Sequence, residues 1–133
     1  MCVFCKIIDG TIPCYKVYED EDFIAFLDIS QATVGHTLLV PKMHAENVFC
    51  LPSHLQEKMG VTLVKMANQL KKTLHVSNLN ILNNNGEAAG QTVPHFHIHL
   101  IPRYPDDDLT IRFKPHLTTP ESSIELQKKI LSN

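Results

Sequence analysis

The sequence predicts an α+β fold, with a five-stranded antiparallel sheet, one long helix against it and a short C-terminal helix. The helix is predicted by residues 53–75, where apolar side chains recur every three or four positions. The strands are predicted by short apolar runs between turn residues, and by histidines that alternate with apolar residues. These runs are 15–19, 23–27, 35–40, 79–82 and 95–101.

Length and composition indicate one domain. The chain has 133 residues, 44% of them hydrophobic, which suffices for a core without cross-links. A net charge of -2 and no basic stripe give no indication of a nucleic-acid partner. The sequence shows neither a membrane-spanning stretch nor a signal-peptide pattern, so we expect a cytoplasmic protein without a membrane partner.

The first two strands are expected to form an antiparallel hairpin. The acidic run 19–22 connects residues 15–19 to residues 23–27. Asp28 directly follows the second strand, where side chains often reach a functional site. On local grounds Asp28 is equally a turn-forming residue, and the sequence leaves both interpretations open.

The third strand carries the first of several histidines. Residues 35–40 end at Pro41, and strand alternation places His36 and Leu38 on one face. His44 lies in the loop that follows this strand. Taken alone, it would be a surface histidine.

The long helix is expected to pack on the sheet. A capping box of Ser53 and Gln56 is expected at its start. We assign no chemistry to this helix, because methionine and leucine at this spacing are typical of a core. Its apolar stripe consists of Leu55, Met59, Leu63, Met66, Leu70 and Leu74.

A turn and a small-residue loop precede the alternating histidines. Residues 83–86, Asn-Asn-Asn-Gly, tolerate left-handed backbone conformations. Gly90 lets backbone amides approach an anion, although a plain hairpin loop would look similar.

The C-terminal part has a different character. Residues 103–115 are rich in proline and aspartate, and we expect them to cross the surface. Thr119 is expected to cap a last helix that begins with Pro120. This helix is expected to cover either the domain or a partner subunit.

The most informative stretch is His95-Phe96-His97-Ile98-His99, between Pro94 and Pro102. In a strand the three imidazoles share one face, while the apolar residues between them face a core. A solvated polar face, a metal site and covalent catalysis by one imidazole all fit this pattern. The residues alone leave the choice open.

Residues 95–101 match every position of His-φ-His-φ-His-φ-φ, where φ is apolar, and so resemble the signature of the histidine-triad (HIT) superfamily. The resemblance spans about residues 3–101 and is closer to the Hint branch, in its bacterial form, than to Fhit. It implies a single HIT domain over 1–133, with a core at about 3–102 and a C-terminal extension at 103–133. Further matching residues are Phe4, Lys6, Ile7, Ile8, Ile12, Pro13, Ala25, Phe26, Asp28, Ile29, His36, Pro41, Lys42, His44, Asn84, Gly90 and Gln91.

The resemblance implies chemistry at the α-phosphate of a nucleotide. His97 would attack phosphorus and form a nucleotidyl-imidazole intermediate that water hydrolyses. His99 would contact the phosphate and handle protons, with His36 in the shell of the active site. The transferase branch, similar to galactose-1-phosphate uridylyltransferase, has glutamine at the position of His99, so a hydrolase is favoured.

The resemblance also implies a nucleotide-binding set for a purine nucleotide substrate. Asp28 is expected on the ribose hydroxyls. The loop around the phosphate and leaving group would consist of Asn84, Gly90, Gln91 and Thr92. The apolar slot for the base would consist of Val3, Phe4, Ile7, Phe26 and Leu38, and Ile29 is included in the set.

Two further expectations concern metal and assembly. Related bacterial proteins place zinc so that Cys2, Cys5, His44 and His95 would be the ligands of a structural Zn2+. Two reduced thiols near the N-terminus are the alternative. Cys14 and Cys50 have no matching partners and are expected to be free thiols. The resemblance also implies a homodimer.

The predicted function is hydrolysis of nucleoside phosphoramidates or related nucleotides, as in a purine nucleoside phosphoramidase. Hydrolysis of dinucleoside polyphosphates and nucleotidyl transfer are alternatives. In a metalloenzyme, His95, His97 and His99 would instead bind a catalytic zinc. A nucleotide-binding or scaffolding module with little activity is the remaining alternative.

Overall fold

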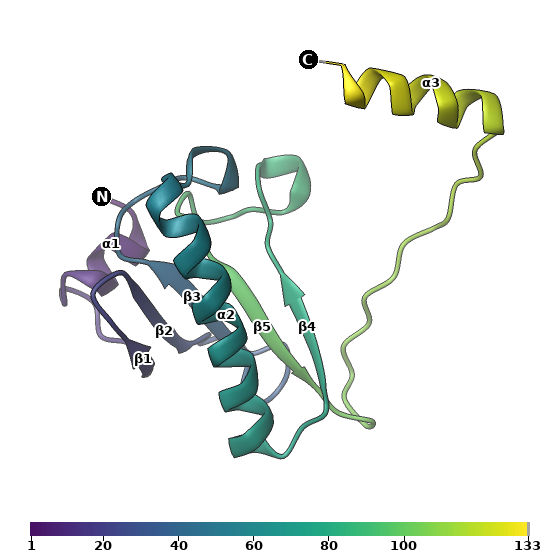
Figure 1. Ribbon diagram of the computed structural model, residues 1–133. Coiled ribbons are helices and arrows are strands. Elements are labelled where there is room, and N and C mark those ends of the chain that lie inside the picture. The colour runs from purple at the N-terminus through teal and green to yellow at the C-terminus, as the bar shows by residue number, and fades with distance from the viewer. Residues whose placement is uncertain (133) are drawn as a thin grey trace.

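The structure is a computed structural model that describes residues 1–132. It contains the predicted five-stranded antiparallel sheet, with strands in the order β1-β2-β3-β5-β4 and one long helix across one face (Figure 1). The predicted fold class is therefore confirmed. The strands are β1 (Lys16–Glu19), β2 (Phe23–Leu27), β3 (Thr37–Pro41), β4 (Asn78–Leu82) and β5 (Ile98–Arg103).

The long helix α2 (Ser53–Leu74) and the C-terminal helix α3 (Pro120–Leu131) are both present as predicted. A third helix, α1 (Val3–Ile8), was not expected, because six residues are too few for a periodic pattern. Two short 3₁₀ turns, Val48–Cys50 and Glu87–Ala89, complete the helical elements of the described chain. None of the helices within residues 1–132 has the length and apolar character needed to cross a membrane.

The start of α2 differs from the prediction. Pro52 occupies the N-cap position, and no side chain caps the helix. The Gln56 side chain instead donates a hydrogen bond to the Leu51 carbonyl at 3.0 Å. The predicted capping box is wrong because Ser53 already lies inside the helix, one position too late to serve as its cap.

The sheet has an apolar cluster on each face. On the α2 face, Leu39, Phe96 and Leu100 pack with the buried stripe of the helix. On the opposite face, Phe4 of α1 packs against buried residues of β2 and β3. Alternation along each strand therefore divides the side chains between two layers.

Strand register builds a row of side chains on the α1 face. Phe26 of β2 lies opposite Leu38 of β3, and Leu38 lies opposite His99 of β5. Residues directly opposite each other in a sheet point to the same face. An apolar pair is therefore placed beside a histidine.

The histidine strand begins later and ends later than predicted. β5 starts at Ile98, because the Phe96 amide donates to the Ala45 carbonyl in a loop at 2.7 Å instead of to a neighbouring strand. It continues through Pro102, which pairs only with Leu79 of β4, so one side of the proline meets no strand. Pro102 does not end the strand.

Residues beyond β5 leave the body of the domain (Figure 1). The predicted cap of the last helix is confirmed, because the Thr119 side chain accepts a hydrogen bond from the Ser122 amide, with Pro120 in the first turn. Helix α3 lies away from the sheet, so it does not cover its own domain.

The two faces of α2 differ in their effect on stability. Met66 is 2% exposed, and we expect Met66→Ala to lower the free energy of unfolding by about 2–5 kcal/mol through cavity formation. Val61 is 68% exposed, so the control Val61→Ala stays within about 0.5 kcal/mol of the parent. Urea unfolding measures both values, and equal losses would contradict the described packing.

Candidate functional site

The α1 face of the sheet contains a cavity of about 340 Å³. α1 and the row of Phe26, Leu38 and His99 contribute to its wall. Asp28 and Thr92 lie at the same cavity, so the structure brings together residues far apart in the chain. The predicted nucleotide-binding residues that line it are Val3, Phe4, Ile7, Phe26, Asp28, Ile29, Leu38, Thr92, His97 and His99.

Three predicted residues are not part of this lining. Asn84 and Gly90 lie close together, since a Cβ placed on Gly90 would be 3.7 Å from the Asn84 amide nitrogen. Gln91 holds the loop, because its side chain accepts from the Gly86 amide and donates to the Glu46 and Val93 carbonyls. A role for the three in phosphate binding stays a prediction.

Sequence reasoning did not single out several residues of the site. The cavity is also lined by Ile12, Pro13, Cys14, Leu27 and Val93. Ile12 and Pro13 belong to the HIT-like pattern, which is the signal that could have found them, whereas nothing marked Cys14. Asn83 was also missed, and its side chain donates a 2.8 Å hydrogen bond to the carbonyl of His97.

His97 is buried and has one ring nitrogen engaged. Its Nδ1 lies 2.8 Å from the His95 carbonyl oxygen, which can only accept, so Nδ1 carries a proton and donates it. In the neutral ring, Nε2 then holds the lone pair. The Phe4 ring packs edge-on against His97 with centroids 5.0 Å apart. Burial lowers the pKa of His97 and favours this neutral form.

His36 orients His99 through a chain of hydrogen bonds. The Ala32 amide donates to His36 Nδ1 at 3.1 Å, so the proton of the neutral His36 ring is on Nε2. That N–H faces His99 Nδ1 at 2.9 Å and donates to it. The remaining nitrogen of His99, Nε2, therefore carries an N–H.

Burial also governs the charge of these rings. Burial, with His97 and His36 as neighbours, lowers the pKa of His99 to about 4. Burial lowers the pKa of His36 as well, although Asp28, whose carboxylate lies 3.6 Å from His36 Nε2, opposes this shift. The ligand atoms of Asp28, His36 and His99 lie close enough for a metal, but the hydrogen bond between the two rings already accounts for their approach.

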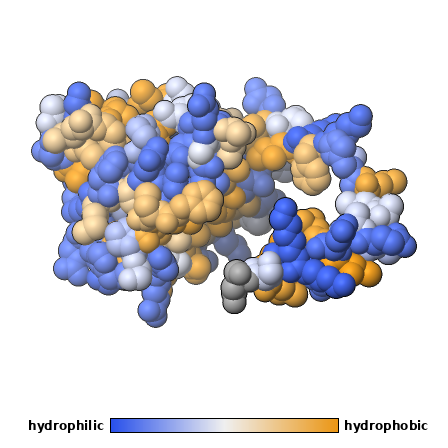
Figure 2. Space-filling model, turned by 90° about the horizontal axis from the view of Figure 1, so that it is seen from above, coloured by the Kyte–Doolittle hydropathy of each residue, from blue (hydrophilic) through white to orange (hydrophobic). Residues whose placement is uncertain are grey.

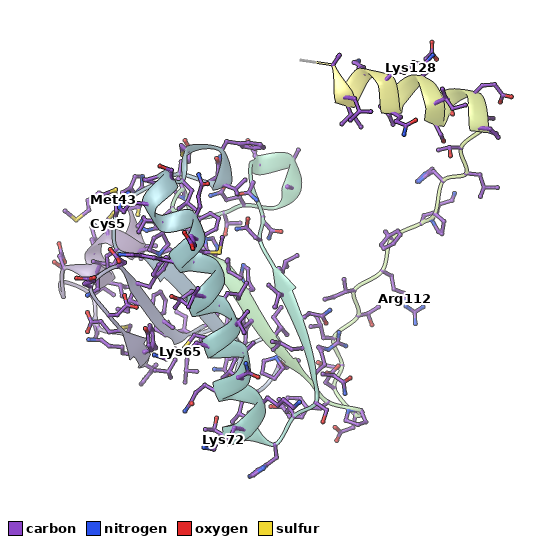
Figure 3. All side chains as sticks on the ribbon, viewed as in Figure 1. Cys5, Met43, Lys65, Lys72, Arg112 and Lys128 are labelled. Carbon is purple, nitrogen blue, oxygen red and sulfur yellow. The ribbon has the colours of Figure 1, made fainter. Side chains whose placement is uncertain are left out.

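Beside the cavity, Cys2, Cys5, His44 and His95 bring four ligand atoms together. The six separations between the two Sγ and the two Nδ1 atoms range from 3.1 to 3.7 Å. Near-equal separations between all four atoms describe a tetrahedron. Figure 3 labels Cys5 on α1 and Met43 at the same end of the domain, next in sequence to His44. These four residues could hold a metal ion, as the sequence predicted.

The second nitrogen of His95 supports that arrangement. His95 Nε2 lies 2.8 Å from the Pro41 carbonyl oxygen and donates to it, which leaves the Nδ1 lone pair toward the cysteines. Since both ring nitrogens of His95 face the Pro41 carbonyl and the cysteines, the three triad histidines do not converge on one point. Among residues 1–132 they form no common ligand group, which contradicts the alternative of a three-histidine catalytic metal.

The fold and the histidine cluster are those of a histidine-triad domain. Residues 9–106 match the HIT domain family, and the chain belongs to this family. The protein hit of Bacillus subtilis is 52% identical over 107 residues, which cover 80% of this chain and 74% of that protein. The adenosine 5′-monophosphoramidase of Schizosaccharomyces pombe is 35% identical over 98% of this chain and 96% of its own.

Solved structures agree with this assignment. HIT family proteins from B. subtilis and Bacillus anthracis superpose with TM-scores of 0.92 and 0.90, at 46% and 48% identity. Each superposition covers 97% of this chain and 94% of the other. A Zn-bound histidine-triad protein from Mycobacterium smegmatis is 40% identical, with a TM-score of 0.77 over 86% of this chain and 84% of its own.

Acidification should destabilise the fold partly through His99. Its pKa of about 4 in the folded protein lies below the ordinary 6.5, so the unfolded chain takes up the proton first as the pH falls. The contribution of His99 is therefore complete above about pH 6.5 and is lost as the pH falls toward 4. Besides burial, the neighbouring rings of His97 and His36 lower the pKa of His99, whereas the Asp28 carboxylate raises it.

We expect His99→Gln to reduce the stability lost between pH 7 and pH 5 by about 2 kcal/mol. Urea unfolding at the two pH values measures this difference. His54→Gln, on the exposed side of α2, is the matched control and should keep the parental loss. The same loss in His99→Gln and in the parent would refute the assigned shift.

Proposed function

We propose that this protein hydrolyses purine nucleoside phosphoramidates or related nucleotides at the α-phosphate, through a covalent nucleotide on His97. One observation carries the proposal: His97, whose ring has a free lone pair, and His99, whose ring has a free N–H, line the same cavity. The backbone assigns the lone pair to His97 Nε2 and the N–H to His99 Nε2. The phosphoramidase activity named for the S. pombe relative supports this substrate class.

In the first step, His97 Nε2 bonds to phosphorus and the bond from phosphorus to the leaving nitrogen breaks. The leaving nitrogen keeps the electron pair and takes a proton from a water molecule. The positive charge that develops on the ring of His97 is stabilised by the His95 carbonyl at Nδ1. The N–H of His99 donates to a phosphoryl oxygen and stabilises the charge there.

In the second step, the hydroxide left from that water bonds to phosphorus. The bond between phosphorus and His97 breaks, and its electron pair returns to Nε2. The products are a nucleoside monophosphate and an amine, and His97 is neutral again. The lowered pKa of His97 favours a free lone pair at the start of each cycle.

The cavity offers groups for the rest of the nucleotide. Asp28 is the carboxylate of the lining and suits the ribose hydroxyls, since its oxygens accept hydrogen bonds. The apolar side chains of Val3, Phe4 and Leu38 suit a purine base. Aromatic and aliphatic side chains favour a flat base, but they make few hydrogen bonds to its polar atoms and so distinguish poorly between purines.

We propose that Cys2, Cys5, His44 and His95 bind a structural zinc ion. Zinc bonds of about 2.3 Å to sulfur and about 2.0 Å to nitrogen give tetrahedral edges of about 3.3–3.8 Å, close to the separations in this cluster. The Zn-bound M. smegmatis neighbour supports the choice of metal. Zinc held there would cross-link α1 to the loop after β3 and to His95, leaving His97 free for catalysis.

We propose that the protein is cytoplasmic. Cys2 and Cys5 must stay reduced to bind zinc, which fits a cytoplasmic protein. We also propose a homodimer. Its support is the exposed apolar surface beyond residue 109.

His97→Ala should reduce kcat for an adenosine phosphoramidate by at least about a thousandfold, because no other group replaces the attacking nitrogen. Steady-state amine release measures kcat, and bound zinc measured on the same sample should be unchanged. His116→Ala, on the exposed C-terminal segment, is the control and should keep parental activity. Near-parental turnover in His97→Ala would contradict covalent catalysis by this residue.

Cys5→Ser should lose most of the bound zinc, because a serine hydroxyl is a poor zinc ligand. We expect the thermal midpoint to fall by at least about 5 °C, since α1 loses its cross-link. Metal analysis and thermal unfolding measure the two effects. Cys50→Ser, outside the cluster, should change neither. If Cys5→Ser kept one zinc per chain, the assigned ligand set would be wrong.

A further inference from the structure

The backbone of His97 lies beyond the hydrogen-bond ladders of the sheet. Toward its start, β5 pairs with β3 as far as Ile98 and with β4 as far as His99. Among the described residues, neither β3 nor β4 pairs with His97, although the proposed function needs its ring in one fixed place. The contacts that hold this part of the backbone come from loops.

Two hydrogen bonds anchor the chain before and after the His97 ring. Before it, the Phe96 amide donates to the Ala45 carbonyl at 2.7 Å. After it, the His97 carbonyl accepts from the Asn83 side chain at 2.8 Å. The ring is attached to the Cα atom between these two anchors, so together they fix the direction in which the ring leaves the chain. In that position, its Nδ1 meets the His95 carbonyl at 2.8 Å.

Backbone groups at both ends of a relay set the orientation of the Asn83 side-chain amide. At one end, the Val48 amide can only donate, so the atom that faces it at 2.7 Å is Asn85 Oδ1. Asn85 Nδ2 then donates to Asn83 Oδ1 at 2.6 Å, which turns Asn83 Nδ2 toward His97. At the other end, the His97 carbonyl can only accept. Both ends therefore require the same orientation.

The relay joins two loops that are far apart in the chain. Asn83 and Asn85 belong to the turn after β4, and Val48 begins the 3₁₀ turn Val48–Cys50. The two turns lie at the same end of the domain (Figure 1). Helix α3 stands off from the body of the domain in Figure 2, and the described contacts of the relay all come from the domain itself.

Asn83 lies outside the cavity that would hold the nucleotide. It is half-buried and does not line that cavity, whereas His97 does. Its amide nitrogen and its oxygen both have protein partners, the His97 carbonyl and the Asn85 side chain. Asn83 is therefore placed to act on a bound nucleotide through His97.

We infer that Asn83 is a positioning residue for His97: its side chain holds the His97 carbonyl and so keeps the ring on the His95 carbonyl. Asn85 acts through Asn83, because it fixes the orientation of the Asn83 amide. The inference rests on the proposed function, since it concerns the placement of the attacking ring. It adds to the site two residues that do not line the cavity.

Asn83→Asp tests the inference most sharply, because it keeps the size of the side chain and its acceptor for Asn85 but removes the donor. A carboxylate oxygen then faces the His97 carbonyl oxygen, and two acceptors repel each other. We expect kcat to fall at least about thirtyfold in Asn83→Asp and only about three- to tenfold in Asn83→Ala, which removes the repulsion as well. A residue needed only for packing would give the opposite order, because alanine removes more contacts.

Steady-state hydrolysis of an adenosine phosphoramidate measures both kinetic constants. KM should stay within threefold of the parental value, because the residues that line the cavity are unchanged. Calorimetric titration with adenosine monophosphate should still give one site per chain, which excludes partial unfolding as the cause of a lower kcat. Asn78→Asp makes the same change at an exposed position of β4 and should keep the parental kcat. A parental kcat in Asn83→Asp would overturn the inference.

The role of Asn85 can be tested by combining substitutions. Since Asn85 acts through Asn83, the double variant Asn83→Ala with Asn85→Ala should have the kcat of Asn83→Ala within twofold. Losses that multiply in the double variant would show that the two residues act independently, and would overturn the relay.

The position of the ring can also be measured without turnover, by nitrogen-15 NMR of the histidine rings at about pH 8, where they are neutral. His97 should be a single tautomer with its proton on Nδ1 in the parent and in Asn78→Asp, and a mixture of tautomers in Asn83→Asp. An unchanged tautomer in Asn83→Asp would overturn the inference. If the tautomer changed but the parent showed no turnover, the proposed function would fall and the positioning of His97 by Asn83 would stand.

Discussion

The site depends on backbone groups that fix the proton positions of buried histidine rings. A carbonyl can only accept and an amide can only donate, so each assigns one ring nitrogen and thereby the other. The carbonyls of His95 and Pro41 and the amide of Ala32 do this for His97, His95 and His36. His36 Nε2 donates to His99 Nδ1, which places the proton of the neutral His99 ring on Nε2. Four similar side chains thus receive different chemical properties from their positions on the backbone.

The metal cluster and the catalytic cavity share this backbone. His95 and His97 are two residues apart, yet one ring faces two cysteines and the other faces the cavity. Phe4 of α1 packs on both rings, with centroids 5.9 Å and 5.0 Å away. Because α1 also carries Cys5, the residues that would hold zinc also position one wall of the nucleotide cavity. This contact is the physical link between a structural metal and the catalytic chemistry.

The sequence predicted the parts of the fold that depend on local periodicity. The strand at 23–27 has the bounds that its pattern indicated, and the helix over Ser53–Leu74 ends one residue before the predicted end. α1 is too short to show a period, and the start of β5 depends on a contact with Ala45 that lies 51 positions earlier in the chain.

The family pattern found most of the cavity lining. It did not indicate Cys14 or Asn83, whose roles arise from packing between distant segments. Asp28 satisfies both of its interpretations, since Oδ1 accepts from the Ser30 amide while the residue lines the cavity.

The claim that a nitrogen of His97 bonds to phosphorus is tested most directly by trapping the intermediate. The protein would be incubated with a slowly hydrolysed adenosine phosphoramidate, quenched rapidly, digested and sequenced by mass spectrometry. The account predicts adenosine monophosphate on the peptide of residues 95–99, attached at His97 and missing in His97→Ala. Adenylate on another residue, or no adduct while product forms at the parental rate, would contradict it.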